Sequence, residues 1–170
     1  MLGVVLLYVG IVLINNGIAR IANIDAKSMA VMNVFVGFLS ITINIITIIH
    51  GDFEAINGVG DFYSAATGLL FGFTYLFVAV NGIFNLDTKL YGYYSLFVAI
   101  NSIPAAIIEF FVNGHHKMGI IWILWGILWL TGYIENVKKK ELIFVPYLDI
   151  FECIFTALIP VFLMLTNLWK

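Results

Sequence analysis

The sequence is poor in charge and in the residue types that build soluble active sites. Charged residues make up 11% of its 170 residues, roughly half the share usual in soluble domains, whereas 62% are hydrophobic. A single cysteine, Cys153, excludes a disulfide framework and a cysteine-based metal site. The motifs H-E-x-x-H and G-x-S-x-G and a phosphate-binding glycine loop are absent. We therefore expect a membrane protein that is not an enzyme and binds no cofactor, metal ion or nucleic acid.

Long apolar runs make up most of the sequence. Six of them are long enough, at about 20 residues, to cross a bilayer as helices. The first should remain in place rather than be cleaved as a signal peptide, because no Lys or Arg precedes it and no polar domain follows. The sequence thus predicts an all-α integral membrane protein with one domain over residues 1–170. The predicted spans are 2–22, 29–49, 62–84, 91–112, 118–136 and 144–168.

The positive charges predict the orientation of these spans. Short cytoplasmic loops of membrane proteins are enriched in Lys and Arg. The connections after the second and fourth spans contain only Lys117, whereas those after the first, third and fifth contain six basic residues. Both termini are therefore expected outside, together with the segments 50–61 and 109–117. The six inner residues are Arg20, Lys27, Lys89, Lys138, Lys139 and Lys140.

The two outer segments contain every histidine of the chain. Histidine gains a positive charge on mild acidification, and nearby carboxylates can respond to the same change. Because all three histidines lie on one side of the membrane, we predict that they and the nearby carboxylates form a pH-sensing group. Solvated loop histidines without a switching role are an equal alternative. The predicted group is His50, His115, His116, Asp52, Glu54, Asp61 and Glu109.

One pattern occurs three times along the chain. A large apolar residue precedes a glycine, and another large apolar residue follows that glycine by three positions. A phenylalanine stands 25 residues after each glycine. Matched landmarks at one separation predict three two-helix hairpins, about 1–49, 62–112 and 118–168, around a pseudo-threefold axis. Chance recurrence in an apolar sequence is the alternative. The landmarks are Gly10 and Phe35, Gly72 and Phe97, and Gly126 and Phe151.

The residues flanking these glycines predict an apolar pore. A pseudo-threefold axis would bring them together at two levels, as two stacked constrictions. Trp122 lies on one helical stripe with Trp125 and Trp129, and each indole N–H at that depth needs a partner. Such a pore suits a small, neutral, polar solute better than an ion; packing of large side chains in a core is the alternative. The predicted lining is Val9, Leu13, Phe71, Tyr75, Trp122, Trp125 and Trp129.

One acidic residue stands where the other two repeat units have an apolar residue. Glu152 occupies the position at which the other two units have Val36 and Val98. A carboxyl group within a membrane normally faces a cavity or finds a partner. We predict that Glu152 is a hydrogen-bonding station inside the pore, the alternative being a bond to a neighbouring helix. Asp149 is expected at the membrane interface, and Glu135 beside the lysine run.

Several stretches resemble the urea/amide channel family. They include the N-terminal run, ATGLLFGFTY at 66–75, YSLFVAIN at 94–101 and WILWGILWLT at 122–131, so the resemblance covers nearly the whole chain. It implies a six-helix protomer of three hairpins, assembled as a homo-hexamer with one urea pore per subunit. The resemblance places the pore constrictions at the positions that the repeats indicate and includes Leu128 among the constriction residues. It also implies that Glu152 is the glutamate that faces the pore.

The resemblance also implies a function. It predicts a passive urea channel of a bacterial inner membrane, with periplasmic termini, that supplies cytoplasmic urease, whose ammonia protects against acid. The outer histidines favour opening by acidic periplasmic pH. One alternative is an ungated channel for short-chain amides or ammonia. Another is a membrane anchor or assembly subunit without transport activity.

Overall fold

The computed structural model describes residues 2–51 and 60–169, in which every regular element is a helix. Within these ranges six helical spans are long and apolar enough to cross a membrane, the last running over Val145–Leu165. The predicted all-α, multi-pass membrane fold is therefore confirmed. The elements are α1 (Leu2–Ile21), α2 (Ala26–His50), α3 (Asp61–Phe84), α4 (Lys89–Phe111), α5 (His116–Asn136), α6 (Val145–Glu152), the π-helical η1 (Cys153–Leu158) and α7 (Ile159–Leu165).

Tight turns join α1 to α2 and α3 to α4. Asn23 and Asn85 both adopt the left-handed backbone region, with φ of 51° at each. Asparagine enters this region more readily than most other residues do. The carboxylate of Asp25 then caps α2 by accepting hydrogen bonds from the backbone N–H groups of Lys27 and Ser28. These turns fix how each pair of helices reverses direction.

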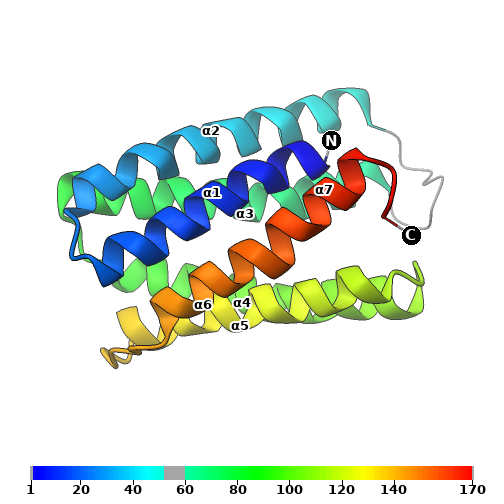
Figure 1. Ribbon diagram of the computed structural model, residues 1–170. Coiled ribbons are helices and arrows are strands. Elements are labelled where there is room, and N and C mark those ends of the chain that lie inside the picture. The colour runs from blue at the N-terminus through cyan, green and yellow to red at the C-terminus, as the bar shows by residue number, and fades with distance from the viewer. Residues whose placement is uncertain (1, 52–59, 170) are drawn as a thin grey trace.

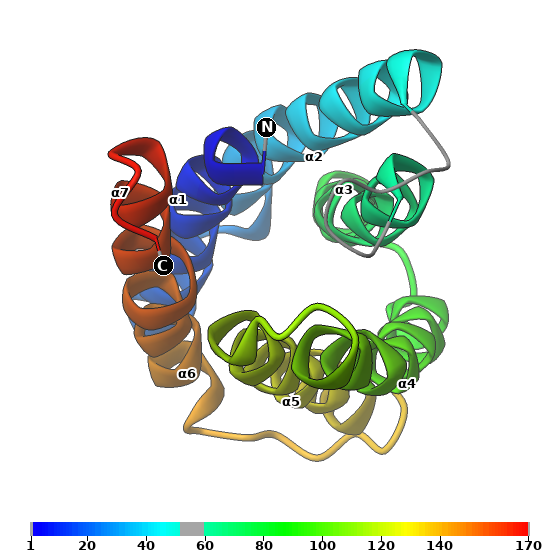
Figure 2. The ribbon, with the colours of Figure 1, turned by 90° about the vertical axis from the view of Figure 1, so that its right-hand side faces the viewer.

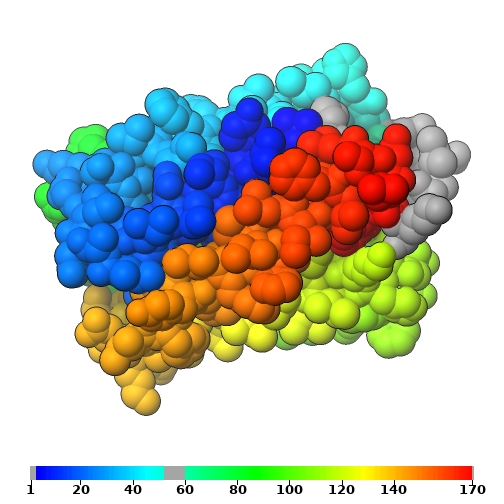
Figure 3. Space-filling view, in the orientation of Figure 1, coloured from blue at the N-terminus to red at the C-terminus, as the bar shows by residue number. Residues whose placement is uncertain are grey.

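The helices form a ring when the bundle is viewed along its length (Figure 2). The closest packing joins α2 to α3, α4 to α5, and α1 to the last span. Figure 3 shows α1 and the last span side by side. Each close pair thus joins two different sequence units rather than the two helices of one unit. Both chain ends lie at the end of the bundle where α2 terminates (Figure 1).

The landmark glycines lie where these close pairs touch. A Cβ added to Gly126 would stand 2.1 Å from the Ser102 hydroxyl of α4, and one added to Gly72 would stand 2.7 Å from the Ile41 side chain of α2. At Gly10 the nearest atom, a methyl group of η1, would be 3.3 Å away. All three glycines therefore lie where an odd-numbered span contacts the even-numbered span beside it, and the absence of a Cβ permits the closest approach at Gly126 and a less close one at Gly10.

The last span changes its winding near its middle. Pro160 has no N–H to donate to the carbonyl of Thr156, so the regular α-helical bond is missing there. The segment Cys153–Leu158 is π-helical, and the N–H of Ile159 bonds the carbonyl of Ile154, five residues back. In α4, by contrast, Pro104 lies within a continuous α-helix.

Candidate functional site: two cavities that share an aromatic waist

Two of the cavities in the described part of the bundle share lining residues. The His-side cavity has a volume of about 330 Å³ and includes Asp61 and Glu109 in its lining. The Arg-side cavity, of about 290 Å³, includes Arg20 and Glu135. Three residues line both cavities, namely Val9, Phe71 and Trp125, which we call the waist. Each of the three directly precedes a landmark glycine, so the structure brings together one equivalent residue from each sequence unit.

The other predicted lining residues divide between the two cavities. Trp122 lines the His-side cavity. The residues three positions after each landmark glycine, which form the second predicted constriction, line the Arg-side cavity together with Leu128. That level consists of Leu13, Tyr75 and Trp129.

Aromatic contacts fix the waist. The Phe71 ring meets the Trp125 and Trp129 rings edge to face, with centroids 4.7 Å and 4.8 Å away. It also meets the Trp122 ring at 6.0 Å. Edge-to-face pairs are the geometry that aromatic rings prefer, because the positive ring edge points at a negative face. Phe71 thus holds three tryptophans of α5 in place from the opposite side.

Two threonines satisfy the buried indole groups. Trp125 Nε1 donates to Thr156 Oγ1 at 2.9 Å, and Trp129 Nε1 donates to Thr74 Oγ1 at 3.1 Å. Each threonine hydroxyl in turn donates to a backbone carbonyl four residues earlier, at 2.7 Å. Both tryptophans are therefore oriented by fixed acceptors. Sequence reasoning recognised the need for partners but did not identify these two residues.

Glu152 is buried beside the cavities without lining either one. Its side chain is 0% exposed, as is that of Val98 at the equivalent position. Neither carboxyl oxygen has a hydrogen-bond partner in the part of the chain that the structure describes. Its backbone carbonyl accepts the bond from Thr156, which holds Trp125. Glu152 is therefore coupled to the waist through its backbone.

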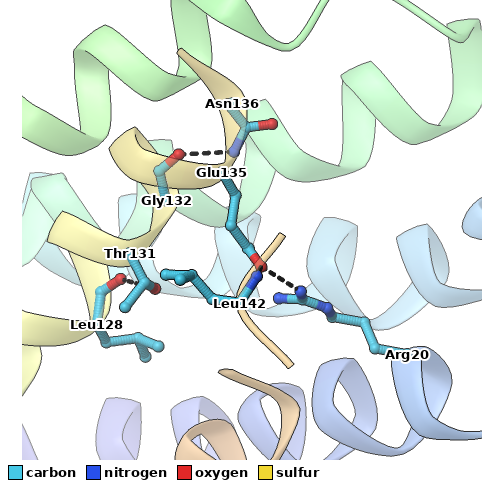
Figure 4. A network of polar contacts seen from close by, with 7 residues as sticks. All are labelled: Arg20, Leu128, Thr131, Gly132, Glu135, Asn136 and Leu142. Atoms are coloured by element: carbon cyan, nitrogen blue, oxygen red, sulfur yellow. Dashed lines mark hydrogen bonds and ion pairs between the residues drawn. The ribbon is translucent and has the colours of Figure 1, made fainter. Parts of the chain in front are cut away.

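Two acidic residues have partners or surroundings that the sequence did not indicate. Asp149, expected at the membrane interface, is only 7% exposed and lines the Arg-side cavity. Glu135, expected beside the lysine run, instead binds Arg20 at 2.6 Å and accepts from the backbone N–H of Leu142 at 3.2 Å (Figure 4). Both expectations considered neighbours along the chain, whereas the fold supplies neighbours from other helices.

The histidines lie at the other end of the bundle. His115 Nδ1 is 3.1 Å from Glu109 Oε2, and the two side chains are 52% and 15% exposed. The His116 ring lies 5.8 Å from the Phe110 ring, and His50 is exposed at the end of α2. Asp61 and Glu109 therefore line the His-side cavity, and His115 lies beside it through its contact with Glu109. Asp52 and Glu54 lie outside the described residues.

The site and fold together define a class of protein. The molecule is a helical membrane protein with a mostly apolar cavity toward each end, each lined by a few polar and charged side chains, and an aromatic constriction between them. This arrangement is suited to passage of a small solute. Within the described ranges no three His, Cys, Asp or Glu side chains gather to hold a metal ion. A family model of AmiS/UreI family transporters matches residues 1–168, and the chain belongs to this family. Membership in a transporter family agrees with the prediction that the chain is not an enzyme.

Relatives of known or assigned function resemble the chain over most of its length. It is 48% identical to the acid-activated urea channel of Helicobacter pylori, covering 99% of this chain and 100% of the relative. The closed-state structure of the H. pylori urea channel superposes with a TM-score of 0.92, covering both chains completely. A Mycolicibacterium smegmatis protein named for transport of amidate substrates is 33% identical over 99% of this chain and 78% of its own length.

Proposed function

We propose that this protein is a passive urea channel of a bacterial inner membrane that opens when the periplasm becomes acidic. The observation that supports it most is the waist shared by two cavities, in a chain 48% identical to an acid-activated urea channel. The His end of the bundle then faces the periplasm together with both termini. The Arg end faces the cytoplasm, as the distribution of Lys and Arg predicts.

The waist favours a neutral solute over an ion. Removing an amide-like group from water without partners costs roughly 2–7 kcal/mol, and removing an isolated charge costs far more. Aromatic faces accept N–H groups weakly, which offsets part of the cost for urea. Because Thr74 and Thr156 already bind the indoles, the waist offers a fixed, mostly apolar surface. Solutes regain stronger hydrogen bonds in the cavity on either side.

Acid opening would begin at the His end. As pH falls, the histidines gain positive charge and nearby carboxylates lose negative charge. His115 Nδ1 lies 3.1 Å from an oxygen of Glu109, which lines the His-side cavity, so added positive charge on the imidazole would act directly beside that cavity. We infer that this change shifts a two-state equilibrium of the helix ends toward the open form, so that flux rises on acidification.

We propose three hairpins related by a pseudo-threefold axis, and a homo-hexamer with one pore in each subunit. The equivalent contacts of Gly10, Gly72 and Gly126 support the internal symmetry. Large apolar side chains exposed on the helices, such as Phe38 at 60% and Phe97 at 57%, are suited to lipid and to neighbouring subunits. In the cell the channel would supply cytoplasmic urease with urea and so contribute to acid resistance.

Urea uptake into proteoliposomes, followed by stopped-flow light scattering against empty liposomes, tests the function. We expect uptake well above the control, and no increase would favour an anchor or assembly subunit. Glu152→Gln should alter urea flux while oligomer size is unchanged. Unchanged flux would instead give Glu152 a role in helix packing alone.

A second candidate is an ungated channel for short-chain amides or ammonia. It is supported by the 33% identity to the amidate-named relative. Urea, thiourea, acetamide and ammonia should be compared in the same vesicles. Faster acetamide than urea flux that is independent of pH would favour this second candidate.

A further inference from the structure

The Arg-side cavity is lined by the carboxyl group of Asp149, for which no ion pair or hydrogen bond is found among the described residues. Asp149 is 7% exposed and lines this cavity. The ion pairs found among the described residues join Arg20 to Glu135 and His115 to Glu109, and neither includes Asp149. In the same residues no side-chain hydrogen bond ends on it. The charges of Arg20 and Glu135 act on this carboxyl group, but no direct hydrogen bond to it is found within the described ranges, so a solute in the cavity can supply the hydrogen bonds that a largely buried carboxyl group needs.

Close packing holds Asp149 in position. A Cβ at Gly17 of α1 would stand 2.6 Å from the Pro146 carbonyl and 3.3 Å from the Asp149 Cβ. The start of α6 therefore lies directly against α1, and Asp149 has little freedom to move away. Rigid placement is what a binding group needs, because no ordering cost then arises when a solute arrives.

A hydrogen-bond donor lines the same cavity. Asn16 exchanges hydrogen bonds with Asn33, donating at 3.3 Å and accepting at 2.7 Å. This contact uses one of the two amide hydrogens of Asn16, so the second is left to point toward a solute. Arg20 is fixed at the mouth by Glu135, 2.6 Å away. The cavity therefore presents a free acceptor and a free donor beyond the waist.

We propose that Asp149 and Asn16 form a binding station for solutes with two adjacent NH₂ groups on one carbonyl carbon. The carboxylate accepts one N–H from each nitrogen of urea, and the Asn16 amide donates to the urea oxygen. Glu135 is less suited to this role because its Oε1 already accepts from Arg20 and from the backbone N–H of Leu142. The station receives urea as it leaves the apolar waist, which makes Asp149 a residue that selects for urea. This inference rests on the proposed urea flux and specifies where that selection occurs.

Fluxes of urea and acetamide through the full-length protein in proteoliposomes test the station. Asp149→Asn keeps the side-chain size but leaves only one acceptor oxygen, and acetamide has a single NH₂ group. We expect urea flux to fall by roughly tenfold, the effect of losing one hydrogen bond to a charged group, and acetamide flux to fall much less. Glu141→Gln, at an exposed acidic residue outside both cavities, is the matched control and should change neither flux.

Each outcome has a defined meaning. A lower ratio of urea to acetamide flux in Asp149→Asn supports the station. Equal losses for both solutes, or no loss, overturn it while urea flux through the unmodified protein still stands. Absence of urea flux in the unmodified protein overturns the proposed function as well. If Asp149→Asn does not fold, Asp149→Ser is measured in the same way, and failure of both variants to fold would assign Asp149 to packing and overturn the station.

Discussion

The two ends of the bundle contain different kinds of charged pair. At the His end, His115 lies 3.1 Å from Glu109 and is half exposed. At the Arg end, Arg20 lies 2.6 Å from Glu135, which also binds the backbone of the connection between α5 and α6. An imidazole changes charge in the mildly acidic range, whereas a guanidinium group does not. The comparison supports our proposal that acid sensing belongs to the His end, and it predicts that the ion pair at the Arg end keeps its charge at all working pH values.

The largest effect should come from removing the histidines. We expect a variant with His50, His115 and His116 all changed to Gln to lose its rise in urea flux between pH 7.5 and pH 5. Coupling between two sites typically changes an equilibrium constant by a factor of about 5 to 150. We expect the acid-induced rise in urea flux to shrink by a factor in this range. Flux measurements in vesicles at both pH values provide the test. A triple variant that keeps the full acid response would assign sensing to other groups, and our comparison of the two ends would be wrong.

Breaking the pair at the Arg end should reduce stability without changing the pH response. In Glu135→Gln, Arg20 loses its charged partner, so the free energy of unfolding should fall by about 1–3 kcal/mol. The lower value is expected because Arg20 is about one-third exposed and solvent screens the pair. Thermal unfolding in detergent measures it. The exchanged pair Arg20→Glu with Glu135→Arg should recover part of the loss. An altered ratio of flux at pH 5 to flux at pH 7.5 in Glu135→Gln would show that this end also senses acid.

A change at the waist should affect both pH conditions equally. Trp125→Phe removes the 2.9 Å bond to Thr156 while the Thr156 hydroxyl keeps its carbonyl acceptor. Loss of one neutral hydrogen bond is worth roughly 1 kcal/mol, so urea flux should change by about fivefold. The ratio between pH 5 and pH 7.5 should remain that of the unmodified protein. A selective effect at one pH would indicate that the waist itself moves during opening.

The smallest effect should come from the turn that precedes His115. Gly114 has a φ of +70°, and an added Cβ there would meet nothing within 4 Å. Asparagine tolerates this backbone region, so Gly114→Asn should change stability by no more than about 0.5 kcal/mol and keep the acid response. Gly114→Val, which is strained there, should weaken the response by misplacing His115. Equal behaviour of the two variants in flux assays would mean that the turn does not position the histidine.

The sequence predicted the helices well, because apolar length is a local property, and the repeat spacing marked candidate equivalent positions. It located six spans and marked Val9, Phe71 and Trp125 as equivalents, which the structure brings to one constriction. It did not reveal that the last span closes the ring against α1, since a repeat shows which positions correspond but not which ones touch.

The polar partners were harder to predict. The Arg20–Glu135 pair joins residues 115 positions apart, and Thr74 lies 55 positions from the indole that it binds. Hydrogen bonds over such separations depend on how helices are arranged around the ring. Glu152 was predicted in the pore from its chemistry, and the structure buries it beside the cavities. Glu152 is the last residue before the π-helical turn that begins at Cys153, a change of winding that the sequence did not predict.

We propose a urea pore that acid opens at the His end of the bundle. The most direct measurement is stopped-flow urea uptake into right-side-out membrane vesicles at external pH 5 and pH 7.5, compared with everted vesicles and with vesicles lacking the protein. We predict fast uptake at pH 5 in right-side-out vesicles only, with slow uptake at pH 7.5. Uptake no faster than in vesicles lacking the protein, at either pH and in either orientation, would contradict the account.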